Sequence, residues 1–127
     1  MIKLQKIFEE LILESDTQKI VDAINGKYRV KIEYAGDDDS PAGSRTIEVY
    51  SYGISLGGNP QIRAYQIWGV SKKGAPNWKT FRVDRIQKWE STGFKFYSPI
   101  EQRDSTAPAF NPNSDRLMKT IYNMIKF

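Results

Sequence analysis

The stretch between Gln61 and Glu90 constrains the fold of this chain more than any other part of the sequence. Within it, polar and apolar residues roughly alternate over two runs, Ile62–Ser71 and Trp78–Val83, as half-buried strands require. The intervening loop, Lys72–Asn77, contains a glycine and a proline, which are typical of turns. The pattern therefore predicts two antiparallel strands joined as a hairpin.

Positive charge is concentrated in the same stretch. It holds seven cationic and two acidic side chains, a net charge of +5 against +4 for the whole chain: Arg63, Lys72, Lys73, Lys79, Arg82, Arg85 and Lys88, with Asp84 and Glu90. Five aromatic residues are interleaved with these cations: Tyr65, Trp68, Trp78, Phe81 and Trp89. Because rings stack on unpaired bases and cations contact phosphates, the composition suits a nucleic-acid-binding surface. The alternative is a hairpin with core aromatics and a solvated charged face.

The run Thr80–Ile86, TFRVDRI, resembles the end of a WYL domain, a small Sm-like β-barrel found in bacterial and phage regulators. That family has a strand with Trp-Tyr-Leu, a turn, and a strand ending Phe-Arg-Leu-Asp-Arg-Ile. Here Tyr65 occupies the centre of the first motif, and Val83 replaces the leucine of the second. Arg45 and the run Tyr52-Gly53-Ile54 resemble the family's upstream elements, so the likeness extends roughly from Ile20 to Gly93.

The resemblance implies a ligand-sensing or nucleic-acid-binding regulatory part. Such domains are often attached to a helical DNA-binding domain, but the N-terminal helices predicted here are too few and lack a basic recognition helix. The resemblance also implies a binding face made of Arg45, Tyr65, Arg82 and Arg85, with Tyr52 as a weaker addition. Guanidinium groups make bidentate phosphate contacts, and Tyr65 offers a stacking plane. By strand alternation Phe81 belongs to the core, and Asp84 is expected to be an ion-pair partner of its neighbouring arginines.

The N-terminal part reads as helix. A first apolar stripe falls at helical spacing: Leu4, Ile7, Phe8, Leu11 and Ile12. A second short helix is expected to be capped by Ser15 or Asp16 and to end at Ile24, with Gly26 as its stop signal. Its buried face would be Ile20, Ala23 and Ile24. We expect both helices to cover an edge of the sheet, and the alternative is dimerisation through the first.

Three further strands are predicted, Tyr28–Ala35, Arg45–Ser55 and Gly93–Tyr97. In the first, Val30, Ile32 and Tyr34 share one face. Consecutive short strands with tight turns predict an α+β fold built on a small antiparallel Sm-like or SH3-like barrel of about five strands. The chain would be one domain, residues 1–127, with a helical part (1–26), the barrel (27–97), a linker (98–113) and a C-terminal helix (114–127).

The linker and the C-terminal helix follow from composition and spacing. Residues Ser98–Asn113 are rich in proline, serine, asparagine and charge, which predicts an extended connection. After a cap at Asn113 or Ser114, an apolar stripe of helical period follows: Leu117, Met118, Ile121, Tyr122 and Ile125. This helix would dock on its own barrel or on that of a second copy, as in a homodimer.

The composition of the chain excludes several kinds of catalytic and metal-binding site. The chain has no cysteine and no histidine, which removes disulfides, zinc–thiolate sites and a Ser-His-Asp triad. Residues Asp37, Asp38 and Asp39 lack the alternate ligand spacing of a calcium loop and are expected to form a solvated turn. No phosphate-binding loop motif occurs in the sequence. We therefore expect no cofactor, no metal and no enzymatic activity. Without a membrane span or signal peptide, we expect a cytoplasmic protein of a cell or of a phage infecting it.

The favoured hypothesis is a module that binds single-stranded nucleic acid or a nucleotide-like ligand through this basic and aromatic face. One alternative is a protein–protein interaction module, as in a phage or bacterial accessory protein, whose basic face meets an acidic partner. The other is a nuclease or nucleotide-processing enzyme that uses carboxylates which the sequence does not place.

Overall fold

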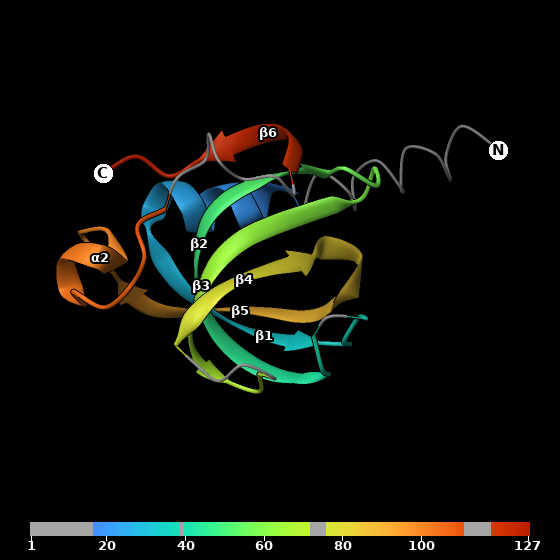
Figure 1. Ribbon diagram of the computed structural model, residues 1–127, viewed down its shortest axis with the longest axis horizontal. Helices are drawn as coiled ribbons and strands as arrows, with labels where there is room; N and C mark the ends of the chain where they lie inside the picture. The colour runs from blue at the N-terminus through green and yellow to red at the C-terminus, as the bar shows by residue number, and fades with distance from the viewer. Residues whose placement is uncertain (1–16, 39, 72–75, 111–117) are drawn as a thin grey trace, which may run out of the picture.

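The computed structural model describes residues 17–38, 40–71, 76–110 and 118–127. A helix at residues 17–26 precedes six strands, a 3-10 turn and a short helix (Figure 1). These elements are β1 (Tyr28–Tyr34), β2 (Gly43–Ser55), β3 (Pro60–Gly69), β4 (Asn77–Arg82), η1 (Val83–Arg85), β5 (Ile86–Lys95), α2 (Ile100–Arg103) and β6 (Met118–Met124). Within the described ranges, no helix has the length and apolar character needed to cross a membrane.

The strands form one antiparallel sheet in the order β4-β3-β2-β1-β5, with β6 added to β2. The predicted α+β class and antiparallel pairing are confirmed, but the sheet is open, so the closed barrel is wrong. The reason lies at η1, where a single 3-10 turn separates β4 from β5. After this turn β5 pairs with β1, and β4 is left as the opposite edge of the strand order.

The apolar periodicities of the N-terminal half are borne out. Val30 and Ile32 are fully buried, and Tyr34 is 2% exposed, so one face of β1 enters the core as predicted. Residues 17–26 are helical, and their apolar positions Ile20, Ala23 and Ile24 are buried in the same core. The expected caps and the first predicted helix lie outside the described residues.

Strand β2 is the centre of the sheet and is buried on both faces. It pairs with β1 through its first half, with β3 along most of its length, and with β6 through its last residues. By alternation along the strand, Glu48 and Tyr50 lie on the face opposite Ile47 and Val49. All four side chains are fully buried. A second layer therefore covers the outer face of β2, and it comes from the C-terminal part of the chain.

The predicted C-terminal helix is wrong, because residues 118–124 form β6. β1 pairs with β2 only as far as Glu48, which leaves the backbone of Ser51–Ser55 without a partner on that side. Backbone N–H and C=O groups that are buried need hydrogen bonds, and β6 supplies them along this edge (Figure 1). The apolar spacing that resembles a helical stripe places Met118 and Ile125 in the buried layer.

Two other boundaries also differ from prediction. The strand expected at Gly93–Tyr97 is the end of a longer strand, since β5 begins at Ile86. The expected linker contains α2. Two residues of this segment, Ile100 in α2 and Ala107 beyond it, are buried. Proline and polar residues led to the prediction of an extended connection, whereas the few apolar residues among them pack against the sheet.

The substitution Gly53→Ala tests how much the β2–β6 pairing contributes to the free energy of unfolding. A Cβ atom at this position would lie 2.0 Å from the Thr120 carbonyl oxygen and 3.0 Å from Ile121 Cα, so β6 would have to move. We expect Gly53→Ala to lower the free energy of unfolding by about 1–3 kcal/mol, as overpacking commonly does. Denaturant unfolding measures this value, and hydrogen exchange should show faster exchange of the β6 amides.

Gly57→Ala is the matched control for this prediction. The nearest atom to a Cβ there would be Asn59 Nδ2 at 3.7 Å, which is an ordinary contact. The control should stay within about 0.5 kcal/mol of the wild type. Equal stabilities of the two variants would contradict the assigned pairing.

Candidate ligand-binding groove

A groove of about 620 Å³ lies between strands β3 and β4, the turn after β2 and the loop after β1. Its lining includes four cationic residues, Arg45, Arg63, Lys79 and Arg82, together with the ring of Trp78. An adjoining hollow of about 360 Å³ shares Arg82 with the groove and adds Arg85. The groove is therefore the place where the basic character seen in the sequence converges.

Cross-strand register places Arg63 and Arg82 on one face of the β3–β4 pair, whereas Lys79 occupies an alternate position, where its Nζ donates a hydrogen bond to Ser71 Oγ at 2.6 Å. In the β3–β4 pair, Arg63 lies opposite Thr80, Ala64 opposite Lys79, and Gln61 opposite Arg82. Arg63 Nη1 donates a hydrogen bond to Thr80 Oγ1 at 2.8 Å. The Arg63 guanidinium also lies 5.9 Å from the centre of the Trp78 ring. Hydrogen bonds of this kind fix the charged groups in position before any ligand arrives.

Arg82 is held by the acid that follows it. Its Nε and Nη2 donate to the two carboxylate oxygens of Asp84 at 3.0 and 2.8 Å, and both side chains are partly exposed. This hydrogen bonding raises the pKa of Arg82, so the guanidinium remains charged. The expected ion pair with Asp84 is present, and Phe81 is fully buried as predicted.

Arg85 lies close to Arg82 in space, as the resemblance implied. It is exposed and lines the adjoining hollow, which both arginines share with the loop after β1. Its carbonyl oxygen accepts a hydrogen bond from the Ala35 N–H at 2.8 Å, which fixes this loop to the 3-10 turn. These two predicted site residues are therefore brought together in the adjoining hollow, and of the two Arg82 also lines the groove.

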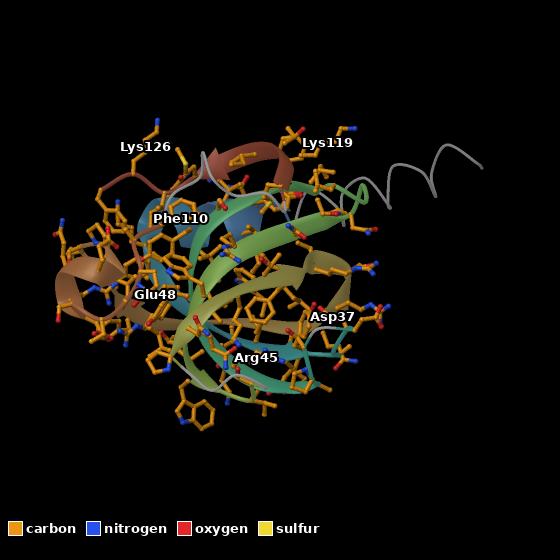
Figure 2. All side chains as sticks on the ribbon, viewed as in Figure 1. Asp37, Arg45, Glu48, Phe110, Lys119 and Lys126 are labelled. Atoms are coloured by element: carbon orange, nitrogen blue, oxygen red, sulfur yellow. The ribbon has the colours of Figure 1, made fainter. Side chains whose placement is uncertain are left out.

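Arg45 lies at the floor of the groove and is fully buried (Figure 2). Its guanidinium lies 5.2 Å from the Tyr34 ring centre and 5.1 Å from that of Phe81. It donates to Gln66 Oε1 at 3.2 Å and to the Pro41 carbonyl oxygen. Burial lowers the pKa of Arg45. Among the described residues, the Arg45 guanidinium forms no salt bridge with a carboxylate. In this conformation Arg45 organises the loop after β1 and is covered from solvent.

Acidic groups from that loop form the other rim of the groove. Asp37 and Asp38 both line it. The Asp37 carboxylate accepts hydrogen bonds from Tyr34 Oη at 2.5 Å and from the Ser40 N–H at 2.7 Å. In the described part of the chain, no group of three or more histidine, cysteine, aspartate or glutamate residues could hold a metal ion, and Asp39 lies outside that part.

The two predicted tyrosines are covered. Tyr65 is 3% exposed, and its ring meets that of Trp78 edge to face at 5.2 Å. Tyr52 is 9% exposed and packs against Tyr122 at 5.8 Å. Neither tyrosine is among the residues that line the groove, so in this conformation neither ring offers it a stacking plane. The aromatic ring that lines the groove is that of Trp78.

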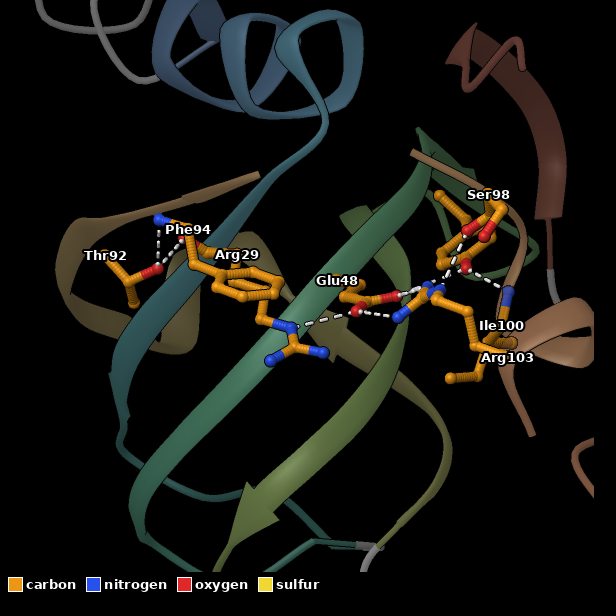
Figure 3. Close-up of polar contacts among 8 residues, drawn as sticks. Arg29, Glu48, Thr92, Phe94, Ser98, Ile100 and Arg103 are labelled. Carbon is orange, nitrogen blue, oxygen red and sulfur yellow. Dashed lines mark hydrogen bonds and ion pairs between the residues drawn. The ribbon is translucent and has the colours of Figure 1, made fainter. Parts of the chain in front are cut away.

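A buried carboxylate anchors the segment that covers the outer face of β2. Glu48 is fully buried, and four groups donate to it: Arg29 Nε at 2.9 Å, Arg103 Nη1 at 2.8 Å, Arg103 Nη2 at 2.5 Å and Tyr50 Oη at 3.3 Å (Figure 3). Arg103 comes from α2, so this ion pair holds residues 98–110 over the outer face of β2. We call these residues the strap.

Further contacts fasten the strap. The Ile100 N–H donates to Tyr50 Oη at 3.0 Å, and the Trp78 indole N–H donates to the Pro108 carbonyl oxygen at 2.7 Å. Phe110 packs against the rings of Tyr50 and Trp78 at 5.4 and 5.5 Å. The strap thereby fixes the orientation of Trp78, whose ring lines the groove.

Sequence reasoning missed Arg63, Lys79, Trp78 and the two aspartates as members of one site. Their cationic and aromatic character was visible in the sequence, but their meeting depends on the β3–β4 register. A hairpin drawn with Arg63 opposite Thr80 would have placed Arg63 and Arg82 on one face, although not Lys79.

Comparisons with known proteins give the fold only. No protein-family model matches the sequence, and no curated protein matches it. The structure is similar to that of proteasome accessory factor B/C (PafBC) of Arthrobacter aurescens, with a TM-score of 0.56 and 19% identity. The match covers 79% of this chain and 14% of that chain, so this chain spans a small part of PafBC. At this identity the likeness shows a shared fold over the matched part of the chain.

The Glu48 ion pair leads to a stability prediction. Glu48→Gln removes the carboxylate charge that faces Arg29 and Arg103, and breaking a buried pair in this way commonly costs 3–5 kcal/mol. Because both arginines are about a quarter exposed, we expect a loss of about 3 kcal/mol in the free energy of unfolding. Denaturant unfolding measures it, and the amide of Ile100 should exchange faster with solvent.

Glu90→Gln serves as the control, since Glu90 is exposed on β5. Its stability should match the wild type within about 0.5 kcal/mol. A Glu48→Gln protein as stable as this control would show that the strap does not depend on the ion pair.

Proposed function

We propose that this chain is a regulatory binding module whose groove takes a phosphate-bearing ligand, either single-stranded nucleic acid or a nucleotide-like molecule. The observation that carries the proposal is the convergence of Arg63, Lys79 and Arg82 in one groove beside the ring of Trp78. Guanidinium groups bind phosphate in bidentate fashion, and an ammonium adds a mobile point charge. The likeness to a WYL-type fold accords with a regulatory role.

The dimensions suit such a ligand. Sites for small molecules commonly have volumes of about 300–1,000 Å³, and this groove has about 620 Å³. Trp78 contributes a ring whose indole N–H is already bonded to the strap, so its plane is fixed for stacking. A nucleotide unit would place its phosphate among the cations and its base beside this ring.

The acidic rim sets the orientation of the ligand in the groove. Asp37 and Asp38 repel phosphate from the end of the groove at which they lie. Carboxylates accept hydrogen bonds from ribose hydroxyls and exocyclic amines, so this rim suits the sugar and base edges. A polyanion without sugar and base would leave these carboxylates unpaired, and we expect it to bind less tightly than a nucleotide of equal charge.

We further propose a role in binding rather than in catalysis, in the cytoplasm of a bacterium or of a phage-infected host. The described groove supplies positive charge, one fixed ring and acceptors, which together suit recognition. Proton transfer would require a base whose position is matched to a reacting bond. A single-stranded oligonucleotide incubated with the protein and a divalent metal should keep its full length. Shortening of the oligonucleotide would contradict this part of the proposal.

Lys79→Ala tests the groove directly. Titration of a labelled oligothymidylate at several salt concentrations should show weaker binding. The slope of log affinity against log salt should flatten by about 0.7 for each phosphate that no longer meets a cation. Arg63→Ala and Arg82→Ala should behave alike. The side chains of Lys79 and Arg82 are only partly buried. The melting temperatures of Lys79→Ala and Arg82→Ala should therefore be close to that of the wild type.

Lys119→Ala is the matched control, because Lys119 is an exposed lysine of β6 that does not line the groove (Figure 2). Its affinity should fall less than that of Lys79→Ala. Wild-type binding no tighter than millimolar at low salt would reject the proposed ligand class and leave the protein–protein interaction module as the better hypothesis. Equal effects of the two lysine substitutions would assign binding to net charge and not to the groove.

A further inference from the structure

A second surface combines exposed rings with cations, and none of its residues lines the groove. It lies where β5 ends beside the start of β1. Three aromatic side chains project there, with exposed fractions of 37% for Tyr28, 51% for Phe94 and 78% for Tyr97. We call this surface the aromatic end. Single exposed rings are ordinary on protein surfaces, but the ring centres of Tyr28 and Tyr97 both lie within about 6 Å of one lysine ammonium, an arrangement that suits a binding role.

A lysine stands between two of the rings. Lys95 Nζ lies 5.7 Å from the ring centre of Tyr28 and 5.9 Å from that of Tyr97. The β1–β5 register places Tyr28 directly opposite Lys95, and Tyr97 follows two positions later. A ring, a cation and a second ring therefore follow one another across this end of the sheet.

The third ring carries its own cation. The Arg29 guanidinium lies 4.1 Å from the centre of the Phe94 ring, and Glu48 holds that guanidinium from the far side (Figure 3). Two arginines share the single charge of Glu48, so one positive charge remains in excess. In the described residues, Tyr28, Phe94 and Tyr97 make no ring–ring contact, so their faces are not used by one another.

The backbone holds the cluster in place. The Phe96 N–H donates to the Lys27 carbonyl oxygen at 2.9 Å, which joins the end of β5 to the start of β1. The Tyr28 ring lies against Gly26, where an added Cβ would come within 2.5 Å of Tyr28 Cε2. Tyr28 and Lys95 are thus arranged before a ligand binds, which lowers the entropy cost of binding.

We propose that the aromatic end binds single-stranded nucleic acid, with bases stacked on Tyr28 and Tyr97 and the backbone phosphates facing Lys95. Alternating rings and cations match the alternation of bases and phosphates along a strand. An apolar protein partner is the poorer fit, because lysine is depleted from the centres of protein interfaces. Duplex DNA is also a poorer fit, because its bases are already stacked on one another. The aromatic end shares no lining residue with the groove.

The test compares two probes of equal length, about twelve nucleotides: a labelled oligothymidylate and an abasic oligomer with the same phosphates. Tyr97→Ala should weaken oligothymidylate binding by about tenfold, and Tyr28→Ala by a similar factor. Neither should change the affinity for the abasic oligomer by more than a small factor. Tyr97→Phe keeps the ring and should restore binding.

Tyr122→Ala is the matched control, since Tyr122 is 61% exposed on β6 and its ring contacts Tyr52. Thermal unfolding checks each variant, and Tyr97→Ala should be as stable as the wild type. Lys95→Ala should weaken binding of both probes, because it removes a cation and no ring. Groove substitutions should likewise weaken both probes, so the two sites fail in distinguishable ways.

Three results would overturn the proposal. Tyr97→Ala and Tyr28→Ala could bind oligothymidylate as tightly as the Tyr122→Ala control. A blunt duplex of the same length could compete as well as the single strand. Vesicles containing anionic lipid could bind in a Tyr97-dependent manner while oligothymidylate does not, which would assign the aromatic end to a membrane surface.

Discussion

The buried carboxylate of Glu48 is the interaction on which much of this structure depends. A charge that is removed from water is tolerated only when opposite charges and hydrogen bonds surround it, and here Arg29 and Arg103 supply both. The two arginines stand 19 and 55 positions away from Glu48 in the chain. One side chain thus joins the first strand, the central strand and the strap, and it gives β2 a buried outer face.

The strap determines which surfaces remain for ligands. It covers Tyr50 on the outer face of β2, and through Pro108 it fixes the ring of Trp78, which in turn packs against Tyr65. Arg63 and Arg82, which the β3–β4 register places on one face, line the groove together with Trp78. The ion pair also orients Arg29 on the ring of Phe94. The groove and the aromatic end therefore both depend on the order that Glu48 imposes.

Arg45 shows how similar residue types take different roles. It was grouped with Arg82 and Arg85 by the resemblance to WYL domains, yet it is fully buried between rings, whereas Arg85 is exposed. A guanidinium can be buried in this way because its planar face is weakly hydrated and stacks on aromatic rings. Its hydrogen bond to the Pro41 carbonyl oxygen shapes the loop whose aspartates form the rim of the groove.

The sequence by itself determined the features that depend on local periodicity. Alternation fixed the buried face of β1 and the core position of Phe81, and helical spacing fixed the buried face of residues 17–26. The concentration of charge between Gln61 and Glu90 anticipated that Arg82 and Arg85 would lie near one another. Only the tertiary structure decided the fate of residues 118–124, because their apolar spacing fits a helix, whereas the unpaired backbone of Ser51–Ser55 requires a strand. It also decided the burial of Tyr65 and Arg45, since a side chain's exposure depends on what distant segments cover it, and periodicity carries no record of those segments.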